Sequence, residues 1–387
     1  MRLVYVSLDP GVPTFGTKGA SVHVQELLRA YRQLGHHVRL VTVRTGGPPP
    51  ADLADVEVIE LARPRTRDVA AREQALLDLD AAAEERIAGL PDVDVVHERY
   101  SLWGGGGIRA ACRLGVPRLL EVNAPLADEQ RRHRELHHVD LAEARFDDTA
   151  EGASAVAAVS EPVAAWVRER AAGAVTHVVP NGVNTDRFRP PAARPTRAFT
   201  VGFVGTLKPW HGVETLIEAV ALLRCDLPET RLVLVGDGPR RDQLEDLARR
   251  RGVPLTATGA IAPAEVPRHL RAMDVAAAPY PAGDQAAYFS PLKVLEYLAA
   301  GIPVVASDTG QVPQLLDHGR SGVLVEPGEA AALADGLRAL ATDPDRRRRL
   351  AAAGRARVLV GHRWTHVAAT SLDLAVRGCA ATQEAAA

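Results

Sequence analysis

Two charged residues lie close together in the stretch YFSPLKVLEYLAAGIPVVAS, which covers residues 288–307. Lys293 stands near the start of a segment whose apolar residues recur at helical spacing, and Glu296 follows three positions later. Free backbone N–H groups at a helix start, the helix dipole and a lysine together attract an anion such as phosphate. A nearby carboxylate can accept hydrogen bonds from both hydroxyl groups of a ribose. The pattern indicates a nucleotide site, with a solvated surface helix as the alternative.

The elements expected to position these two residues are a helix over residues 291–300 and a buried strand over residues 302–306. Ser290 is the predicted N-cap and Gly301 the predicted end of the helix. The β-branched apolar run after Gly301 is typical of a strand that is buried on both faces of a parallel sheet.

The rest of the chain alternates strand and helix patterns in two series. The first series begins with a strand over residues 3–7, a helix over 21–35 and a strand over 38–43, and the second begins with a strand over 200–204. Such alternation predicts the α/β class, with two doubly wound Rossmann-like domains and ligands at the carboxyl ends of the strands. A length of 387 residues agrees with two domains of ordinary size.

Bulk composition excludes several classes of protein. The 47% hydrophobic and 24% charged content is that of a soluble globular protein, and a formal net charge of −2 argues against nucleic-acid binding. Cys112, Cys225 and Cys379 show no metal or redox spacing, which favours free thiols in a reducing cytoplasm. The N-terminus resembles a strand and turn more than a signal peptide, and no apolar run reaches the ~20 residues of a membrane span.

Polar residues and glycines gather where predicted strands end. The loop over residues 16–21 contains Gly16 and Gly19 and can bring backbone N–H groups close to a phosphate or sugar, although a simple tight turn explains it equally well. Glu121 and Asn123 close another strand, as residues of a ligand site would in this architecture.

Two possible metal patterns have simpler explanations. His133 and His137 are four residues apart in a charged segment over residues 129–148, predicted as one helix, but no third ligand accompanies them, and a solvated helix face is favoured. Asp92 and Asp94 form a D-x-D sequence that precedes its strand, which favours a turn.

The 288–307 stretch resembles the donor-binding segment of retaining glycosyltransferases of the GT-B fold, family GT4, whose usual form is E-G-F-G-x-x-x-L-E. Glu296 matches the second glutamate, whereas Tyr288 stands at the position of the first. The residues between them form the F-S-P-L-K variant found in a subset of similar sequences. The stretches VVPNGVNTDRF, residues 178–188, and GHRWTHVAA, residues 361–369, are similar to the segments that close the first domain and the whole chain in that family.

The resemblance implies a domain organisation. Residues 1–189 would form an N-terminal acceptor-binding domain, and residues 196–362 a C-terminal domain that binds the nucleotide-sugar donor across a cleft from it. Residues 190–195 would be the linker. A C-terminal crossover helix over residues 363–387 would pack back on the first domain, with local packing on the second domain as the alternative.

The resemblance also implies roles for individual residues. Thr206 and His211 replace the arginine and lysine of the family pattern G-R-L-x-x-x-K-G, so Lys208 and Lys293 are expected to carry the diphosphate charge, and His211 to add a hydrogen bond or a proton-dependent charge. Trp210, in the same turn, is expected to be a packed aromatic residue. Glu121 and Asn123 are expected to contact the sugar or acceptor. The expected donor-binding residues are Gly16, Gly19, Thr206, His211, Gly236, Gly238, Gly259, Ala260, Ile261, Tyr288, Ser290, Pro291, Leu292 and Glu296.

The function that the resemblance implies is retaining transfer of a sugar from a UDP- or GDP-sugar to a soluble acceptor, including a secondary-metabolite or antibiotic precursor, without a metal or other cofactor. A lipid or cell-surface glycan is the alternative acceptor. Because the first glutamate is missing, a non-catalytic nucleotide-sugar-binding protein is a second alternative. A metal-dependent GT-A enzyme, suggested by Asp92 and Asp94, and a sugar epimerase of similar build are weaker ones.

Overall fold

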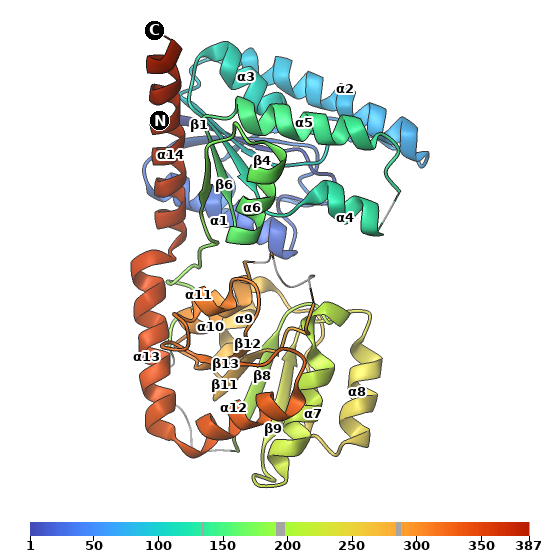
Figure 1. Cartoon of the computed structure of the whole chain (residues 1–387), viewed down its shortest axis with the longest axis vertical. Coiled ribbons are helices and arrows are strands. Elements are labelled where there is room, and N and C mark those ends of the chain that lie inside the picture. The colour runs from blue at the N-terminus through green and yellow to red at the C-terminus, as the bar shows by residue number, and fades with distance from the viewer. Residues whose placement is uncertain (134, 191–197, 284–287, 289, 387) are drawn as a thin grey trace. The chain divides into compact units, whose positions relative to one another are not determined.

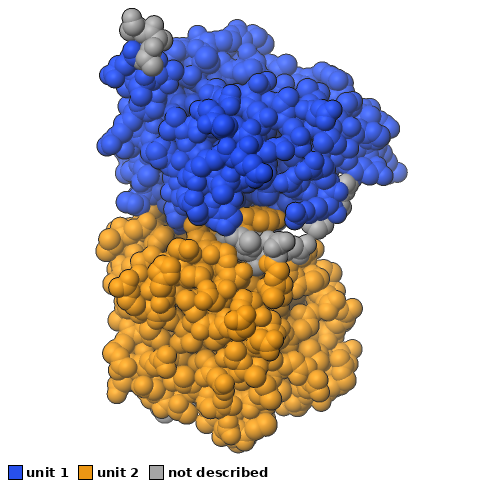
Figure 2. Space-filling view, in the orientation of Figure 1, with its two compact units in different colours: residues 1–181, 364–387 blue, residues 182–363 orange. Residues whose placement is uncertain are grey.

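The computed structural model describes residues 1–133, 135–190, 198–283, 288 and 290–386. The chain divides into two compact units, which Figure 2 colours separately: unit 1 is Met1–Asn181 with Trp364–Ala387, and unit 2 is Gly182–Arg363. Each unit is built on one parallel sheet with helices on both faces (Figure 1). The prediction of two doubly wound α/β domains is confirmed.

Unit 1 contains a seven-stranded sheet in the order β3-β2-β1-β4-β5-β6-β7. Its strands are β1 Arg2–Ser7, β2 His37–Thr42, β3 Glu57–Glu60, β4 Val95–Arg99, β5 Arg118–Val122, β6 Ala155–Ala158 and β7 Thr176–Val178. Its helices are α1 Gly19–Gln33, α2 Val69–Ala88, α3 Gly106–Leu114, α4 Leu126–His133, α5 Val139–Gly152, α6 Glu161–Arg170 and α14 Trp364–Ala386. The strand order reverses between β1 and β4, which is where ligands bind in open parallel sheets.

The alternation of side chains along β1 separates the two faces of this sheet. Val4 and Val6 pack in one apolar cluster with Ile87 of α2 and Ala111 of α3. Tyr5, between them, points to the opposite face, which α1 covers. All three strand residues are fully buried, as expected for a parallel sheet covered on both faces.

Unit 2 contains a six-stranded sheet in the order β10-β9-β8-β11-β12-β13, which reverses between β8 and β11. Its strands are β8 Thr200–Val204, β9 Arg231–Val235, β10 Leu255–Ala257, β11 Val275–Ala278, β12 Val304–Ser307 and β13 Val323–Val325. Its helices are α7 Val213–Arg224, α8 Arg241–Arg250, α9 Val266–Leu270, α10 Leu292–Ala299, α11 Val312–Leu315, α12 Ala330–Thr342 and α13 Pro344–Gly361. Phe203 packs on the side of α7 and α12, and Val204 on the side of α10 and α13.

The boundary between the units falls earlier than the sequence suggested. Residues 182–189, which were assigned to the first domain, belong to unit 2. Val183 and Phe188 are buried in the same apolar cluster as α10. The guanidinium of Arg355 on α13 donates to the carbonyls of Phe188 at 2.7 Å and Thr185 at 3.1 Å. These contacts hold the segment to unit 2. Of the predicted linker, all but Pro190 lies outside the described residues.

Two local predictions differ from the structure. Helix α10 begins at Leu292, one residue later than predicted, and Pro291 stands at the N-cap, so Ser290 is not the cap. The charged segment over residues 129–148 is two helices, because the buried carboxylate of Glu73 accepts hydrogen bonds from the backbone N–H groups of His137 and His138. Helix α4 ends at His133, and His137 lies before the start of α5, so the two histidines do not belong to one helix. In the part of the chain that the structure describes, no group of three or more potential ligands is placed to hold a metal ion.

Within the same described residues, the search for a helix of sufficient length and hydrophobicity to span a bilayer finds none.

Candidate functional site

Glycine turns at the carboxyl ends of β8 and β9 build one side of the candidate donor site. Gly205 follows β8 with φ of +145°, and Gly236 follows β9 with φ of +133°, both in the region that favours glycine. A Cβ at Gly236 would lie 2.2 Å from the carbonyl oxygen of Gly205, and one at Gly238 would lie 2.5 Å from that of Leu207. The two turns are therefore packed backbone against backbone, and no side chain fits between them.

Lys293 occupies the point where the strand order of unit 2 reverses. Its Nζ lies 4.1 Å from the ring centroid of Phe203 on β8 and 5.5 Å from that of Tyr280, which follows β11. The Nζ atom is buried and has no hydrogen-bond partner among the described residues. Burial lowers the pKa of Lys293 to about 7, and the charge of Glu296 opposes part of this effect. A Cβ at Gly205 would lie 3.0 Å from the Nζ, so the glycine leaves open the side from which an anion could approach.

His211 lies beside this lysine and is neutral at physiological pH. Burial, together with the charges of Lys293 and Lys208, lowers the pKa of His211 to about 3. Its Nδ1 lies 2.5 Å from the carbonyl oxygen of Thr206, and because a carbonyl only accepts, Nδ1 carries the ring proton. Nε2 is then an acceptor in the free protein. Nε2 of His211 could donate a hydrogen bond to phosphate only if the negative charge of the phosphate raised the pKa of His211 enough for the ring to be protonated.

Lys208 lies on the same loop, where its Nζ stands 5.4 Å from the ring centroid of Trp210. Trp210 is 38% exposed, and its ring centroid lies 6.2 Å from that of His211 in the same turn. Its indole ring offers Lys208 a cation–π contact.

The other expected donor residues divide between the two units. Gly259 has φ of +71° after β10 and pairs with Gly236 in an isolated antiparallel bridge, which brings the third glycine turn to the first two. Ala260 is exposed, and Ile261 packs partly against the unit 2 core. Tyr288, Leu292 and Glu296 are half-buried, and Ser290 and Pro291 are buried. Gly16 and Gly19 belong to unit 1. Their roles in donor binding stay predictions.

Glu121 of unit 1 is enclosed by a polar network. Its carboxylate lies 2.5 Å from Nε2 of His23, 3.1 Å from Nε2 of His97 and 3.0 Å from Nη1 of Arg99. Tyr5 and Asn123 also donate to it. Burial by itself would raise the pKa of Glu121, but the charges of His23 and Arg99 and the hydrogen bonds from His23 and His97 hold it well below its ordinary value.

The space beside this carboxylate is too small for a sugar. The cavity lined by Glu121 and Asn123 measures about 10 Å³, which admits roughly one water molecule. Glu121 is only 7% exposed. The geometry favours a positioning role for Glu121, which ties β5 to α1 and β4, over the expected contact with sugar or acceptor.

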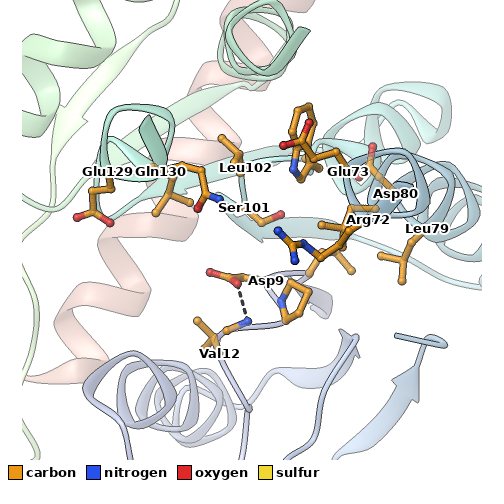
Figure 3. A pocket seen from close by; sticks show the side chains of 16 residues that line it. Asp9, Val12, Arg72, Glu73, Leu79, Asp80, Ser101, Leu102, Glu129 and Gln130 are labelled. Atoms are coloured by element: carbon orange, nitrogen blue, oxygen red, sulfur yellow. Dashed lines mark hydrogen bonds between the residues drawn. The ribbon is translucent and has the colours of Figure 1, made fainter. Parts of the chain in front are cut away.

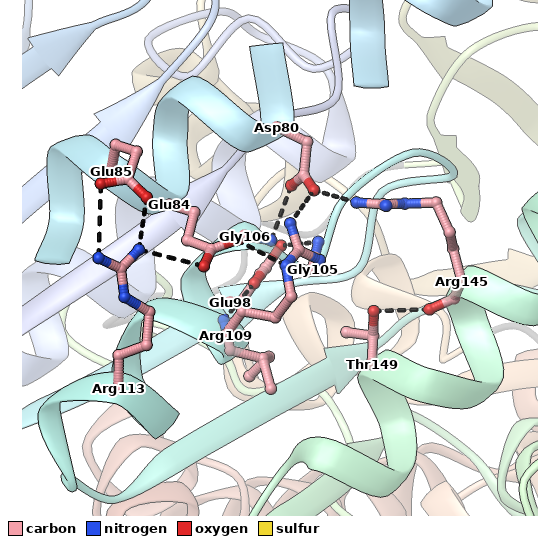
Figure 4. Close-up of polar contacts among 11 residues, drawn as sticks. Asp80, Glu84, Glu85, Glu98, Gly105, Gly106, Arg109, Arg113, Arg145 and Thr149 are labelled. Atoms are coloured by element: carbon pink, nitrogen blue, oxygen red, sulfur yellow. Dashed lines mark hydrogen bonds and ion pairs between the residues drawn. The ribbon is translucent and has the colours of Figure 1, made fainter. Parts of the chain in front are cut away.

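The glycine run over residues 104–107 is occupied by protein carboxylates (Figure 4). Glu98 accepts hydrogen bonds from the backbone N–H groups of Gly105 at 2.7 Å and Ile108 at 2.9 Å, and Asp80 accepts from Gly106 at 2.7 Å. Burial and the charge of Asp80 raise the pKa of Glu98 to about 7. The start of helix α3 is therefore filled from within unit 1 and is not open to a ligand phosphate.

A pocket of about 620 Å³ opens where the strand order of unit 1 reverses (Figure 3). Asp9 follows β1, Ser101 and Trp103 follow β4, and Glu129 and Gln130 come from α4. Carboxylates and an amide beside apolar walls are suited to a ligand that carries hydroxyl groups. The sequence prediction placed a ligand site at strand ends but did not select these residues, because the loops that form much of this pocket have no recognisable motif spacing.

Family models match two successive parts of the chain. A model described as Glycosyltransferase Family 4 matches residues 17–187, and one described as Glycosyl transferases group 1 matches residues 198–343. Most of unit 1 and most of unit 2 are thus covered separately.

Curated relatives agree with these models. The chain is 34% identical over 229 residues to a GDP-mannose-dependent alpha-(1-6)-phosphatidylinositol monomannoside mannosyltransferase of Mycobacterium tuberculosis, a match that spans 54% of this chain and 60% of that relative. It is 29% identical to a D-inositol 3-phosphate glycosyltransferase of Streptomyces scabiei, over 90% of this chain and 83% of the relative.

Solved structures show the same fold. Sucrose-phosphate synthase from Thermosynechococcus elongatus superposes with a TM-score of 0.76 at 21% identity and covers 100% of both chains. Anabaena HepE in complex with UDP superposes with a TM-score of 0.71 at 19% identity, over 96% of this chain and 99% of that one. The two family models show that the chain belongs to the GT4-type glycosyltransferases, and the parallel sheet of each unit together with these likenesses shows the GT-B fold.

Proposed function

We infer that this protein transfers a sugar from a nucleotide diphosphate sugar to a hydroxylated acceptor, with the donor bound by unit 2 and the acceptor by unit 1. The observation that carries the donor assignment is the buried ammonium of Lys293, which lacks a hydrogen-bond partner among the described residues and lies beside the Gly205 turn. A diphosphate supplies the acceptor oxygens that this group needs. The names of the mannosyltransferase relative and of the UDP complex of HepE support a GDP- or UDP-sugar donor.

Departure of the nucleotide is the step that these residues assist. Negative charge grows on the diphosphate as the bond to the sugar breaks, and a preorganised cation in a water-poor site stabilises that charge. Lys293 and Lys208 supply the cations. The resemblance supports retention of configuration without a metal ion, and the leaving diphosphate itself can take the proton of the accepting hydroxyl.

The pocket of unit 1 favours an acceptor of the sugar or cyclitol class. Its lining combines carboxylate and amide groups with leucine and tryptophan walls, which suits a ring that has hydroxyls at its edge and apolar faces. The name of the Streptomyces scabiei relative includes an inositol phosphate, which supports the same class.

Calorimetric titration of the protein with UDP, GDP and ADP tests the donor assignment. One nucleotide should bind clearly better than the other two, and Gly238→Ala should abolish that binding, because its Cβ would meet the Leu207 carbonyl at 2.5 Å. Incubation with the matching sugar nucleotide and a panel of hexoses and cyclitols then tests turnover. Nucleotide binding without any transfer or hydrolysis would favour the non-catalytic alternative, which the tyrosine at position 288 suggests.

A further inference from the structure

Five arginines line a second pocket of unit 1, of about 1040 Å³, which adjoins the pocket just described. They are Arg44, Arg63, Arg65, Arg67 and Arg72. We name this pocket the arginine trough. The only acidic side chain in its lining is Glu60, whose carboxylate accepts hydrogen bonds from the backbone N–H and the hydroxyl of Thr45. Five positive charges against one negative leave a local excess of four, in a chain whose formal net charge is −2.

Within the described part of the chain, the trough arginines form no ion pairs with carboxylates. Elsewhere in unit 1, arginines such as Arg99 and Arg109 bind carboxylates directly. Among the described residues, the guanidinium groups of the five trough arginines form no ion pair, and only that of Arg44 makes a hydrogen bond, to the carbonyl of Pro10 at 3.2 Å. Several guanidinium groups line this pocket without carboxylate partners. Such an arrangement is suited to phosphate, because a guanidinium can donate two parallel hydrogen bonds to phosphate oxygens.

The trough lies at the ligand-binding edge of the unit 1 sheet. Arg44 follows the end of β2, residues 61–67 follow β3, and Arg72 lies in the first turns of α2. Pro10, Arg72 and Leu76 line both the trough and the 620 Å³ pocket, so the two spaces share a wall. Figure 3 shows the guanidinium of Arg72 directed into the smaller pocket, toward the side that carries Asp9.

We propose that the acceptor is a phosphorylated, water-soluble molecule whose hydroxylated ring binds in the 620 Å³ pocket and whose phosphate group binds in the arginine trough. This proposal rests on the function proposed above and adds the charge class of the acceptor. A membrane surface fits less well, because binding to lipid also needs apolar side chains that insert. Among the described residues, none of the large apolar side chains that are exposed lies in either lining.

Titration with a matched pair of ligands tests the proposal without any nucleotide. Glucose 6-phosphate and inorganic phosphate should bind the protein, whereas glucose should bind far more weakly. Raising the salt concentration should weaken binding of the first two ligands. The double variant Arg65→Gln with Arg67→Gln removes two exposed charges of the trough and should lower affinity for glucose 6-phosphate about tenfold. Arg346→Gln with Arg349→Gln removes two exposed charges from α13 of unit 2 and serves as the control, with affinity unchanged.

Equal affinity for glucose and glucose 6-phosphate would overturn the proposal. An equal loss of glucose 6-phosphate affinity in the trough variant and the control variant would do the same. A third contradicting result would be binding only to vesicles that contain phosphatidylglycerol. The last result would assign the trough to a lipid surface. Nucleotide affinity, measured in the same proteins, tests the proposed function separately, because nucleotide binding by unit 2 is not expected to depend on Arg65 or Arg67. If the nucleotide binds but glucose 6-phosphate does not, only the present proposal fails.

Discussion

The buried position of Lys293 is expected to lower the stability of the free protein and to strengthen the binding of a diphosphate. Its amine is removed from water without gaining a hydrogen-bond partner among the described residues, which disfavours its charged form in the free protein. The same isolation strengthens its attraction for a diphosphate. A residue used only for packing would not be expected to show both effects.

The substitution Lys293→Met replaces the amine by a thioether, so it tests the effect of Lys293 on nucleotide affinity and its effect on stability separately. Lys293→Met should weaken nucleotide affinity about tenfold or more, because a hydrogen bond to a charged group contributes about 1.5–3 kcal/mol. Its melting temperature without nucleotide should equal or exceed that of the parent, because the buried amine is gone. Arg250→Met removes an exposed charge from α8 of the same unit and is the control. Unchanged nucleotide affinity in Lys293→Met would contradict the donor site.

The pH dependence follows from the same residue. An unfolded lysine holds its proton up to its ordinary pKa of 10.5, whereas folded Lys293 loses it at about 7. Between these values the unfolded state binds more protons, so this residue makes the free energy of unfolding rise with pH. Nucleotide affinity should fall over the same interval, because the diphosphate binds the charged amine. Chemical denaturation from pH 6 to 9 measures the pH dependence of the free energy of unfolding, and nucleotide titration over the same range measures that of the affinity. Both dependences should be weaker in Lys293→Met.

Glu121 provides the corresponding test in unit 1. Glu121→Gln leaves the histidine and arginine partners without their counter-charge, and breaking a buried ion pair costs about 3–5 kcal/mol. The folded pKa of this carboxyl lies below its ordinary value, so its contribution is present above about pH 4.5 and is lost as the pH falls through the folded pKa.

Chemical denaturation at neutral pH, monitored by the fluorescence of the unit 1 tryptophans, measures the free energy of unfolding and checks this expectation. Glu85→Gln, at an exposed carboxylate paired with Arg113, is the control and should leave stability nearly unchanged. Nucleotide binding by unit 2 should survive in Glu121→Gln. If stability is kept and only transfer is lost, Glu121 acts on substrate after all.

Among the elements of unit 2, the turns after β8 and β9 pack backbone against backbone, and we expect the proposed donor site to depend on this contact. A Cβ at Gly238 would also lie 2.6 Å from the backbone nitrogen of Leu207, so the turn must move to admit it. Gly238→Ala should therefore lose nucleotide binding and some stability, as measured by calorimetry and thermal melting. A Cβ at Gly361, at the end of α13, would meet no other atom within 4 Å. Gly361→Ala should keep binding and gain up to about 1 kcal/mol.

At the scale of the whole molecule, the chain returns to its first unit only at its end. Helix α14 packs with α1, β5 and β6, and its residues Trp364, Ala368 and Ala375 are buried. Deletion of residues 364–387 exposes the face of the unit 1 sheet that α14 covers. Unit 1 should then lose most of its stability and expose apolar surface, as reported by ANS fluorescence. An unchanged unfolding transition in the truncated protein would contradict this packing.

Much of the fold followed from local pattern, because alternating strand and helix periodicities reflect burial that is fixed by neighbours in the sequence. Element ends were less accurate. Ser290 had the side chain of a cap, but the helix starts after Pro291. The helix predicted over residues 129–148 is interrupted by Glu73, a residue distant in the sequence. Tertiary contacts of this kind override local propensity.

The two parallel sheets and the family followed from the sequence, because they depend on short motifs and on periodicity. Which of the residues predicted to bind ligand remain available to one depended on tertiary contacts. Folding encloses Glu121 among cationic partners, fills the start of α3 with Glu98, and leaves the amine of Lys293 buried beside Gly205. It also gathers arginines from three separate segments around one hollow. Availability depends on what surrounds a side chain in space, and spacing along the chain does not encode that.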